Sequence, residues 1–162
     1  MKKEYITSSI KETQKIAEEF AKEISKNLPS SKQGIVIGLK GELGGGKTTF
    51  TQAFAKTLGV KEKVLSPTFV IFKKFAISPT YAVSHKSDLC KHLCKQNLYH
   101  FDCYRIKDSK EILELGFEEI ISNPQNIIVI EWADNIKKIL PPNTIWINFK
   151  FIDTNTRKIM IR

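Results

Sequence analysis

The residues with the clearest chemical meaning lie between Gly41 and Thr48, where the chain reads GELGGGKT. This run fits the pattern GxxxxGK[ST], in which backbone N–H groups surround the phosphates of a nucleotide. Lys47 would place its ammonium against the β- and γ-phosphates, and Thr48 would offer its hydroxyl to Mg²⁺. The residues of the loop expected to contact the nucleotide are Glu42, Leu43, Gly44, Gly45, Gly46, Lys47, Thr48 and Thr49.

Two elements flank this loop and would position it. An apolar run over residues 35–39 is long enough for a buried strand and too short for a globular helix. After the loop, apolar residues continue with helical spacing to Leu58, and Gly59 stands where a C-terminal helix cap belongs. In a strand, loop and helix of this order, the positive end of the helix points at the bound anion. A glycine-rich turn that binds nothing is the alternative.

Two acidic residues could serve the same ligand. Four branched aliphatic residues precede Glu131 and indicate a buried parallel strand with a carboxylate at its C-terminal end, where ligands bind in open α/β sheets. Such an acid holds Mg²⁺, usually through water, or orients the attacking water, although Asp is more usual than Glu there. Asp102 lies in an alternating strand pattern, and a structural acid paired with a lysine or the backbone is the alternative for it.

Composition limits the classes of protein that remain. The 162 residues are 41% hydrophobic and 27% charged, which is typical of one globular domain. The net charge of +9 is compatible with a nucleic acid, with phosphate ligands or with simple solubility. Without a compact arginine stripe or a nucleic-acid motif, direct base reading is not expected. No secretory signal and no apolar run of roughly 18 residues is present, so we expect a cytoplasmic protein with no membrane partner.

The cysteines leave one alternative open. Cys90, Cys94 and Cys103 form an odd number, which suits a reducing compartment. Cys90 and Cys94, with His85 and His92 nearby, could be imagined as a zinc site. Their spacing matches no tight CxxC pair and a second pair is missing, so we favour reduced thiols in a lysine-rich loop.

The remaining segments predict alternating helices and strands. Residues 76–97 are the least regular part and are interpreted as a surface insertion. The other predicted elements are a helix capped by Ser8 or Ser9 and ending near Leu28, strands over 70–75 and 98–106, short helices over 111–116 and 117–121, and an edge hairpin over 144–152 and 157–162. Alternation places His100, Asp102 and Tyr104 on one face of their strand.

The run Ser66-Pro67-Thr68 follows the helix after the P-loop. Many P-loop proteins keep in this position a residue that senses the γ-phosphate through Mg²⁺. A simple turn explains the same three residues equally well.

Taken in order, these segments resemble the TsaE family, also called YjeE, of small P-loop ATPases in bacterial tRNA modification. The resemblance is nearly full length and rests on five motifs that follow one another in this order: GELGGGKTTF, LSPTF, YHFDCYRI, ELGFEEI and IIVIEWAD. It implies a single α/β domain over residues 1–162 with the P-loop NTPase fold, in three layers with a mostly parallel central sheet and an antiparallel edge hairpin. The insertion at 76–97 is longer than the family usually has, which could alter partner docking.

The resemblance also implies roles for single residues. Lys47 and Thr48 would bind phosphate and Mg²⁺, and Asp102 and Glu131 would both be needed for hydrolysis. Either carboxylate could orient the attacking water. In the mechanism that we expect, Thr48 and Glu131 hold Mg²⁺ directly or through water.

Further implications of the resemblance concern the rim of the site and the partners. Thr68 would lie near the Mg²⁺ or the γ-phosphate, and Trp132 near the nucleotide. The partners implied are the TsaD and TsaB proteins, with which ATP turnover supports formation of N6-threonylcarbamoyladenosine in tRNAs that read codons starting with A. The tRNA would be an indirect partner.

We therefore interpret the chain as an ATPase with Lys47, Asp102 and Glu131 as catalytic residues. No arginine finger is identifiable, so slow turnover is expected for the chain alone. A small-molecule kinase is one rival, disfavoured because no arginine precedes Arg105. A nucleotide-gated binding subunit with incidental ATPase activity is the other.

Overall fold

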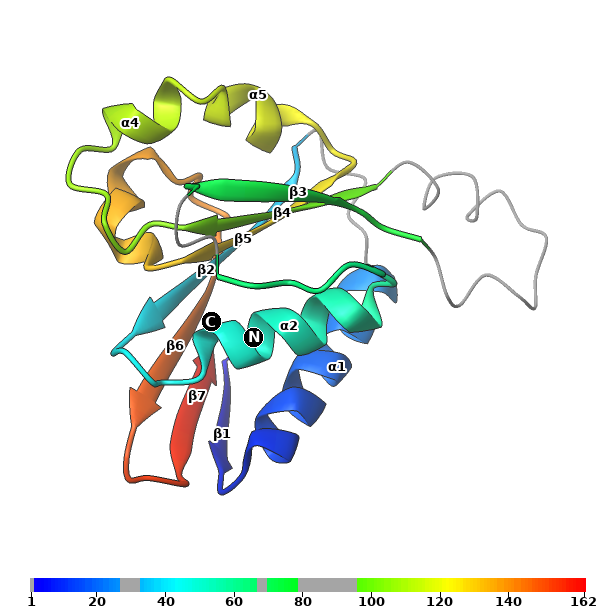
Figure 1. Cartoon of the computed structure of the whole chain (residues 1–162), viewed down its shortest axis with the longest axis vertical. Helices are drawn as coiled ribbons and strands as arrows, with labels where there is room; N and C mark the ends of the chain where they lie inside the picture. The colour runs from blue at the N-terminus through cyan, green and yellow to red at the C-terminus, as the bar shows by residue number, and fades with distance from the viewer. Residues whose placement is uncertain (1, 27–32, 67–69, 79–95) are drawn as a thin grey trace.

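The computed structural model of the chain describes residues 2–26, 33–66, 70–78 and 96–162, and its elements alternate between strands and helices (Figure 1). The strands are β1 (Lys3–Thr7), β2 (Ile35–Gly41), β3 (Phe72–Ala76), β4 (Asn97–Asp102), β5 (Asn126–Glu131), β6 (Ile145–Phe151) and β7 (Arg157–Ile161). The helices are α1 (Ile10–Lys26), α2 (Lys47–Thr57), α4 (Lys110–Leu113), α5 (Phe117–Ser122) and the 3₁₀ helix η1 (Ala133–Ile139).

The strands form one sheet in the order β1-β7-β6-β2-β5-β4-β3. The four central strands β6, β2, β5 and β4 are mutually parallel. Antiparallel pairs complete both sides, with β3 against β4, β7 against β6 and β1 against β7. The predicted α/β fold with a mostly parallel central sheet is confirmed.

The hairpin of β6 and β7 is present, but the sequence analysis did not predict the strand outside it. β1 pairs with the outer side of β7, so the hairpin lies one strand in from the edge of the sheet. β1 has five residues, of which only Thr7 is buried, and its polar sequence KEYIT carries too weak an alternation to predict a strand.

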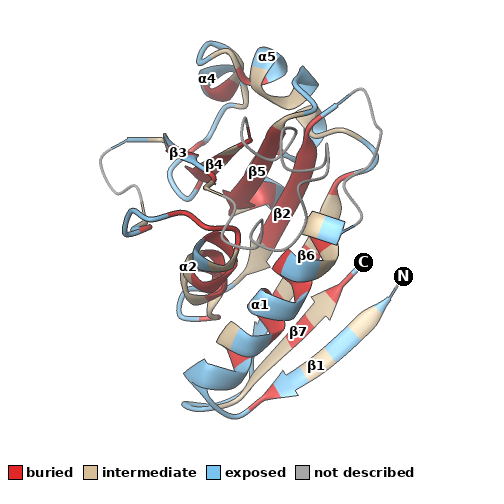
Figure 2. Cartoon of the chain, turned by 90° about the vertical axis from the view of Figure 1, so that its right-hand side faces the viewer, coloured by how far each residue is buried: buried red, intermediate tan, exposed pale blue. Residues whose placement is uncertain are grey.

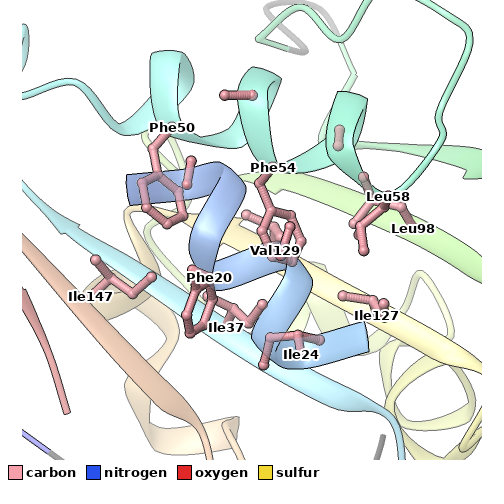
Figure 3. Close-up of a cluster of buried hydrophobic side chains, with 14 of the residues drawn as sticks. Phe20, Ile24, Ile37, Phe50, Phe54, Leu58, Leu98, Ile127, Val129 and Ile147 are labelled. Atoms are coloured by element: carbon pink, nitrogen blue, oxygen red, sulfur yellow. The ribbon is translucent and has the colours of Figure 1, made fainter. Parts of the chain in front are cut away.

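Helices cover both faces of the central strands, which gives the three predicted layers. In Figure 1, α1 and α2 lie to the lower right of the strands, and α4 and α5 lie above β3 and β4. β2 and β5, in the middle of the sheet, are buried along most of their length, whereas only one residue of β1 is buried (Figure 2). Side chains from α1 and α2 meet those of β2, β4, β5 and β6 in one cluster, with Phe20, Phe50 and Phe54 at its centre (Figure 3).

Helix ends follow the signals in the sequence. The Ser8 N–H donates to the Glu12 carboxylate at 2.7 Å, and the Glu12 N–H donates to the Ser9 hydroxyl at 3.2 Å, which fixes the start of α1. After α2, Gly59 has a φ of 92°, and the Val60 N–H donates to the Ala55 carbonyl at 3.0 Å. This is the glycine cap that the sequence predicted.

Several predictions concern residues that the structure does not describe. Thr68 is among them, as are all four residues of the zinc alternative. Most of the insertion at 76–97 also lies outside the described residues, although Ala76 and Asn97, at its two ends, are paired across β3 and β4. Within the described part of the chain, no helix has the length and apolar character needed to span a membrane.

We predict that Phe54→Ala lowers the free energy of unfolding by roughly 3–5 kcal/mol, because Phe54 is fully buried and its ring lies 5.7 Å from that of Phe20. Ile6→Ala is the control, since Ile6 is 68% exposed, and should change stability by about 0.5 kcal/mol or less. Equilibrium urea unfolding measures both variants. Equal losses would contradict the core placed between α1, α2 and the sheet.

Candidate active site

The P-loop connects the end of β2 to the start of α2, and three of its glycines, Gly41, Gly44 and Gly46, have a positive φ. Gly41 has a φ of 134°, and a Cβ there would lie 2.0 Å from the Phe149 carbonyl oxygen on β6. Gly46, the residue before α2, has a φ of 98°. Residues with a side chain rarely adopt either conformation, so the glycines set the path of the loop.

Lys47 lies inside the loop that it follows. Its ammonium donates hydrogen bonds to the carbonyls of Gly41 at 2.7 Å and Glu42 at 2.8 Å. It also lies 3.9 Å from the centroid of the Trp132 ring. Burial lowers the pKa of Lys47, while the nearby carboxylates, Glu131 first among them, oppose this shift. The Lys47 ammonium therefore lies in the loop, as the motif requires. Phosphate oxygens could replace the two carbonyl groups that it contacts.

Glu131 is the buried centre of the site, with a relative exposure of 2%. The Thr48 hydroxyl donates to its Oε2 at 2.8 Å. Its Oε1 lies 3.0 Å from Nε2 of His100 and 3.4 Å from the Thr51 hydroxyl. The predicted acid at the end of the fifth strand therefore contacts the predicted P-loop threonine directly.

Asp102 lies beside Glu131 because β4 and β5 run parallel and end together. The two acids are partners in the register of these strands. The Ser66 hydroxyl donates a hydrogen bond to Asp102 Oδ2, and the Tyr104 N–H donates to Oδ1 at 3.1 Å. Ser66 belongs to the segment interpreted as a switch or a turn, and it contacts an acid of the site.

These residues surround one cavity of about 570 Å³. Of the residues assigned to the catalytic, nucleotide and metal sites from the sequence, all but Glu42 line it, and the Glu42 carbonyl instead accepts a hydrogen bond from Lys47. Thr68, also expected near the site, lies outside the described residues. Residues of the wall that were not assigned to the site from the sequence are Ser66, Val70, Ile71, Tyr104, Arg105 and Ile106. Arg105 is thus an arginine that lines the cavity, whereas the sequence interpretation assigned no arginine to the site.

Trp132 forms part of this wall in an unusual conformation. Its φ of 57° is the only positive value among the described residues other than glycine. A bulky residue in the left-handed region is uncommon, and such strain is found most often at functional sites. The Tyr104 ring lies 5.0 Å from the Trp132 ring, so two aromatic side chains meet at the cavity.

Two polar side chains of the site escaped the sequence analysis. His100 was placed on the polar face of its strand, but no pattern connected it to Glu131. Thr51 lies one helical turn after Lys47 and donates to the carbonyl of Lys47 at 3.0 Å. The spacing of Thr51 from the motif was the one signal that could have placed it near the phosphate site.

The oxygen ligands at this site suit Mg²⁺ better than a softer metal. Carboxylate and hydroxyl oxygens converge at the Thr48–Glu131 contact, and Mg²⁺ binds through one or two such ligands together with phosphate and water oxygens. Among the described residues no three His, Cys, Asp or Glu side chains group as a metal cluster. The residues therefore fit a cation shared with a nucleotide.

Comparison with known proteins agrees with the family resemblance of the sequence motifs. Residues 7–159 match the sequence profile of the family described as "Threonylcarbamoyl adenosine biosynthesis protein TsaE". The tRNA threonylcarbamoyladenosine biosynthesis protein TsaE of Rickettsia typhi is 36% identical over 151 residues, which cover 93% of this chain and 90% of that protein. The TsaE protein of Bacillus subtilis is 36% identical over 131 residues, 80% of this chain and 70% of the other.

A solved structure is similar over almost the whole chain. The crystal structure of YdiB from Bacillus subtilis superposes with a TM-score of 0.69 at 29% identity, covering 99% of this chain and 84% of that one. The similarity supports the α/β fold of the P-loop NTPase type described above.

Cys103 follows Asp102 in the chain, and we predict that its thiol is unreactive in the folded protein. It is fully buried, and burial, with a smaller contribution from the Asp102 carboxylate, raises its pKa to about 12. Iodoacetamide at pH 8 should leave Cys103 unmodified until urea is added, as judged by mass spectrometry of its peptide. Labelling of the native protein as fast as of the unfolded protein would contradict this.

Proposed function

Because the chain belongs to the TsaE family, whose members act in tRNA threonylcarbamoyladenosine biosynthesis, we propose that it hydrolyses Mg²⁺-bound ATP to ADP and phosphate in support of that modification. The observation that carries the proposal is the hydrogen bond of 2.8 Å between Thr48 of the P-loop and Glu131. It joins a phosphate-binding loop to a buried carboxylate within one cavity.

Phosphate binding would begin at the P-loop. The first residues of α2 line the cavity, where the helix dipole favours an anion. Lys47 would exchange the carbonyls of Gly41 and Glu42 for β- and γ-phosphate oxygens. Its ammonium is already buried, so it needs little further desolvation to meet the phosphates.

Thr48 and Glu131 would hold the cation. The Thr48 hydroxyl gives its single proton to Glu131, so its lone pairs remain available for Mg²⁺. Glu131 Oε2 would accept a hydrogen bond from Thr48 and from water bound to the metal. When bound, Mg²⁺ would neutralise charge that develops on the phosphate oxygens.

The water that attacks the γ-phosphate would be oriented by Asp102 or Glu131. Asp102 is held by Ser66 and by the Tyr104 N–H, and it lines the same cavity as Glu131. Both carboxylates accept hydrogen bonds that fix their planes, as a positioned base requires. We therefore propose that one of these two carboxylates, Asp102 or Glu131, orients the water.

We further propose that residues 1–162 act as a single domain. One sheet contains every described strand, from β1 near the N-terminus to β7 near the C-terminus. TsaD and TsaB are the proposed protein partners, and tRNA is an indirect one. Slow hydrolysis by the chain alone, accelerated by these partners, is the expected behaviour.

We predict that Lys47→Met lowers ATP hydrolysis roughly a hundred-fold or more, because a buried cation at the phosphates is lost. Lys56→Met is the matched control, since Lys56 lies exposed on the same helix and outside the cavity. Phosphate release is measured with and without Mg²⁺, and with and without added TsaB and TsaD. If no condition gives hydrolysis, and phosphate passes instead to a small acceptor, a kinase replaces the proposal.

We predict that Glu131→Gln lowers hydrolysis by roughly a hundred-fold and also abolishes formation of the modified base in a reconstituted reaction, because the carboxylate charge is lost. Nucleotide affinity, measured by calorimetry, serves as the control for folding. A variant that no longer hydrolyses ATP yet still supports modification would identify a nucleotide-gated binding subunit instead.

A further inference from the structure

His100 is a fully buried polar side chain that contacts the site without lining the cavity. It lies on β4 opposite Val129 of β5, two residues before Glu131. Its relative exposure is 0%, and its Nε2 is 3.0 Å from Glu131 Oε1. On the same face of β4, the neighbouring side chain Leu98 belongs to the apolar core.

The contact has a defined direction. An ionised carboxylate only accepts hydrogen bonds, so the proton must be on Nε2 of His100. The other ring nitrogen, Nδ1, is buried and has no hydrogen-bond partner among the described residues. The hydrogen bond to Glu131 therefore compensates for the free-energy cost of burying the polar imidazole of His100.

Thr51 cannot take over this function. Its hydroxyl carries one proton, and the carbonyl of Lys47 at 3.0 Å is a closer acceptor than Glu131 Oε1 at 3.4 Å. His100 is therefore the main donor to Oε1, whereas Thr48 is the donor to Oε2. The two oxygens of Glu131 are fixed from opposite sides, by the sheet and by the P-loop helix.

We propose that His100 is a positioning residue for Glu131: its Nε2–H holds Oε1 so that Oε2 stays directed at Thr48 and at the cation held there. This inference rests on the proposed function. Partners of this kind fix the orientation of metal-binding side chains and keep them basic. The role depends only on a proton at Nε2, whatever the state of Nδ1.

Two substitutions of His100 distinguish the effect of its hydrogen bond to Glu131 from the effect of its buried volume. His100→Gln keeps an N–H near the position of Nε2, whereas His100→Leu fills the space without a donor. His100→Leu should lower kcat roughly ten- to a hundred-fold and raise the Mg²⁺ concentration needed for half-maximal binding of a non-hydrolysable ATP analogue, measured by calorimetry. The KM for ATP should change by about three-fold at most, and His100→Gln should restore most of kcat.

Leu98→Val is the control for a disturbed core. Leu98 is fully buried on the same face of β4 and lies opposite Ile127, four residues before Glu131, so this variant should lose stability in urea and keep kcat. A variant that loses kcat only in proportion to its unfolded fraction has a structural effect. Equal kcat for His100→Leu and His100→Gln would overturn the proposal.

The ring proton gives a readout that does not depend on activity. In the unmodified protein, ¹⁵N–¹H correlation spectra should place a slowly exchanging proton on His100 Nε2. A proton on Nδ1 alone overturns the proposal, even if His100→Leu does not fold. If the wild-type chain hydrolyses no ATP, the proposed function fails, while this spectrum still decides whether His100 donates to Glu131.

Discussion

The site depends on one buried negative charge, the carboxylate of Glu131. A charge with 2% exposure is tolerable only when its oxygens are bonded, and its partners come from different parts of the chain. Thr48 lies in the first turn of α2, His100 lies on β4, and Glu131 itself ends β5. Satisfying this carboxylate therefore fixes the P-loop helix against two neighbouring strands, which is the arrangement that a phosphate and its cation need.

The fold supplies this arrangement through parallel strands that end together. β2, β5 and β4 are adjacent and parallel, so the P-loop, Glu131 and Asp102 all lie at the C-terminal ends of these strands. The packing of α1 and α2 on one face of the sheet, around Phe50 and Phe54, then positions α2 relative to the ends of these strands. Lys47, at the start of α2, donates hydrogen bonds to carbonyl groups of the P-loop. Core packing and site geometry are therefore parts of one construction.

Sequence reasoning reached the elements whose signals are local. The P-loop strand and helix, the capped α1, the acid at the end of β5 and the hairpin near the C-terminus all follow from short patterns. It missed β1, because a five-residue polar strand is defined by pairing with β7 rather than by alternation. It also missed the contact of His100 with Glu131, since register between strands is a property of the folded sheet. The left-handed Trp132 could not be foreseen, because surrounding structure imposes that conformation.

The most direct test of the central claim is a crystal structure with Mg²⁺ and a non-hydrolysable ATP analogue. The account predicts that the Lys47 ammonium moves from the carbonyls of Gly41 and Glu42 to the β- and γ-phosphates. It also predicts that Thr48 contacts the cation while Glu131 keeps its bond to His100. A nucleotide bound with its phosphates away from Lys47, or a cation remote from both Thr48 and Glu131, would contradict it.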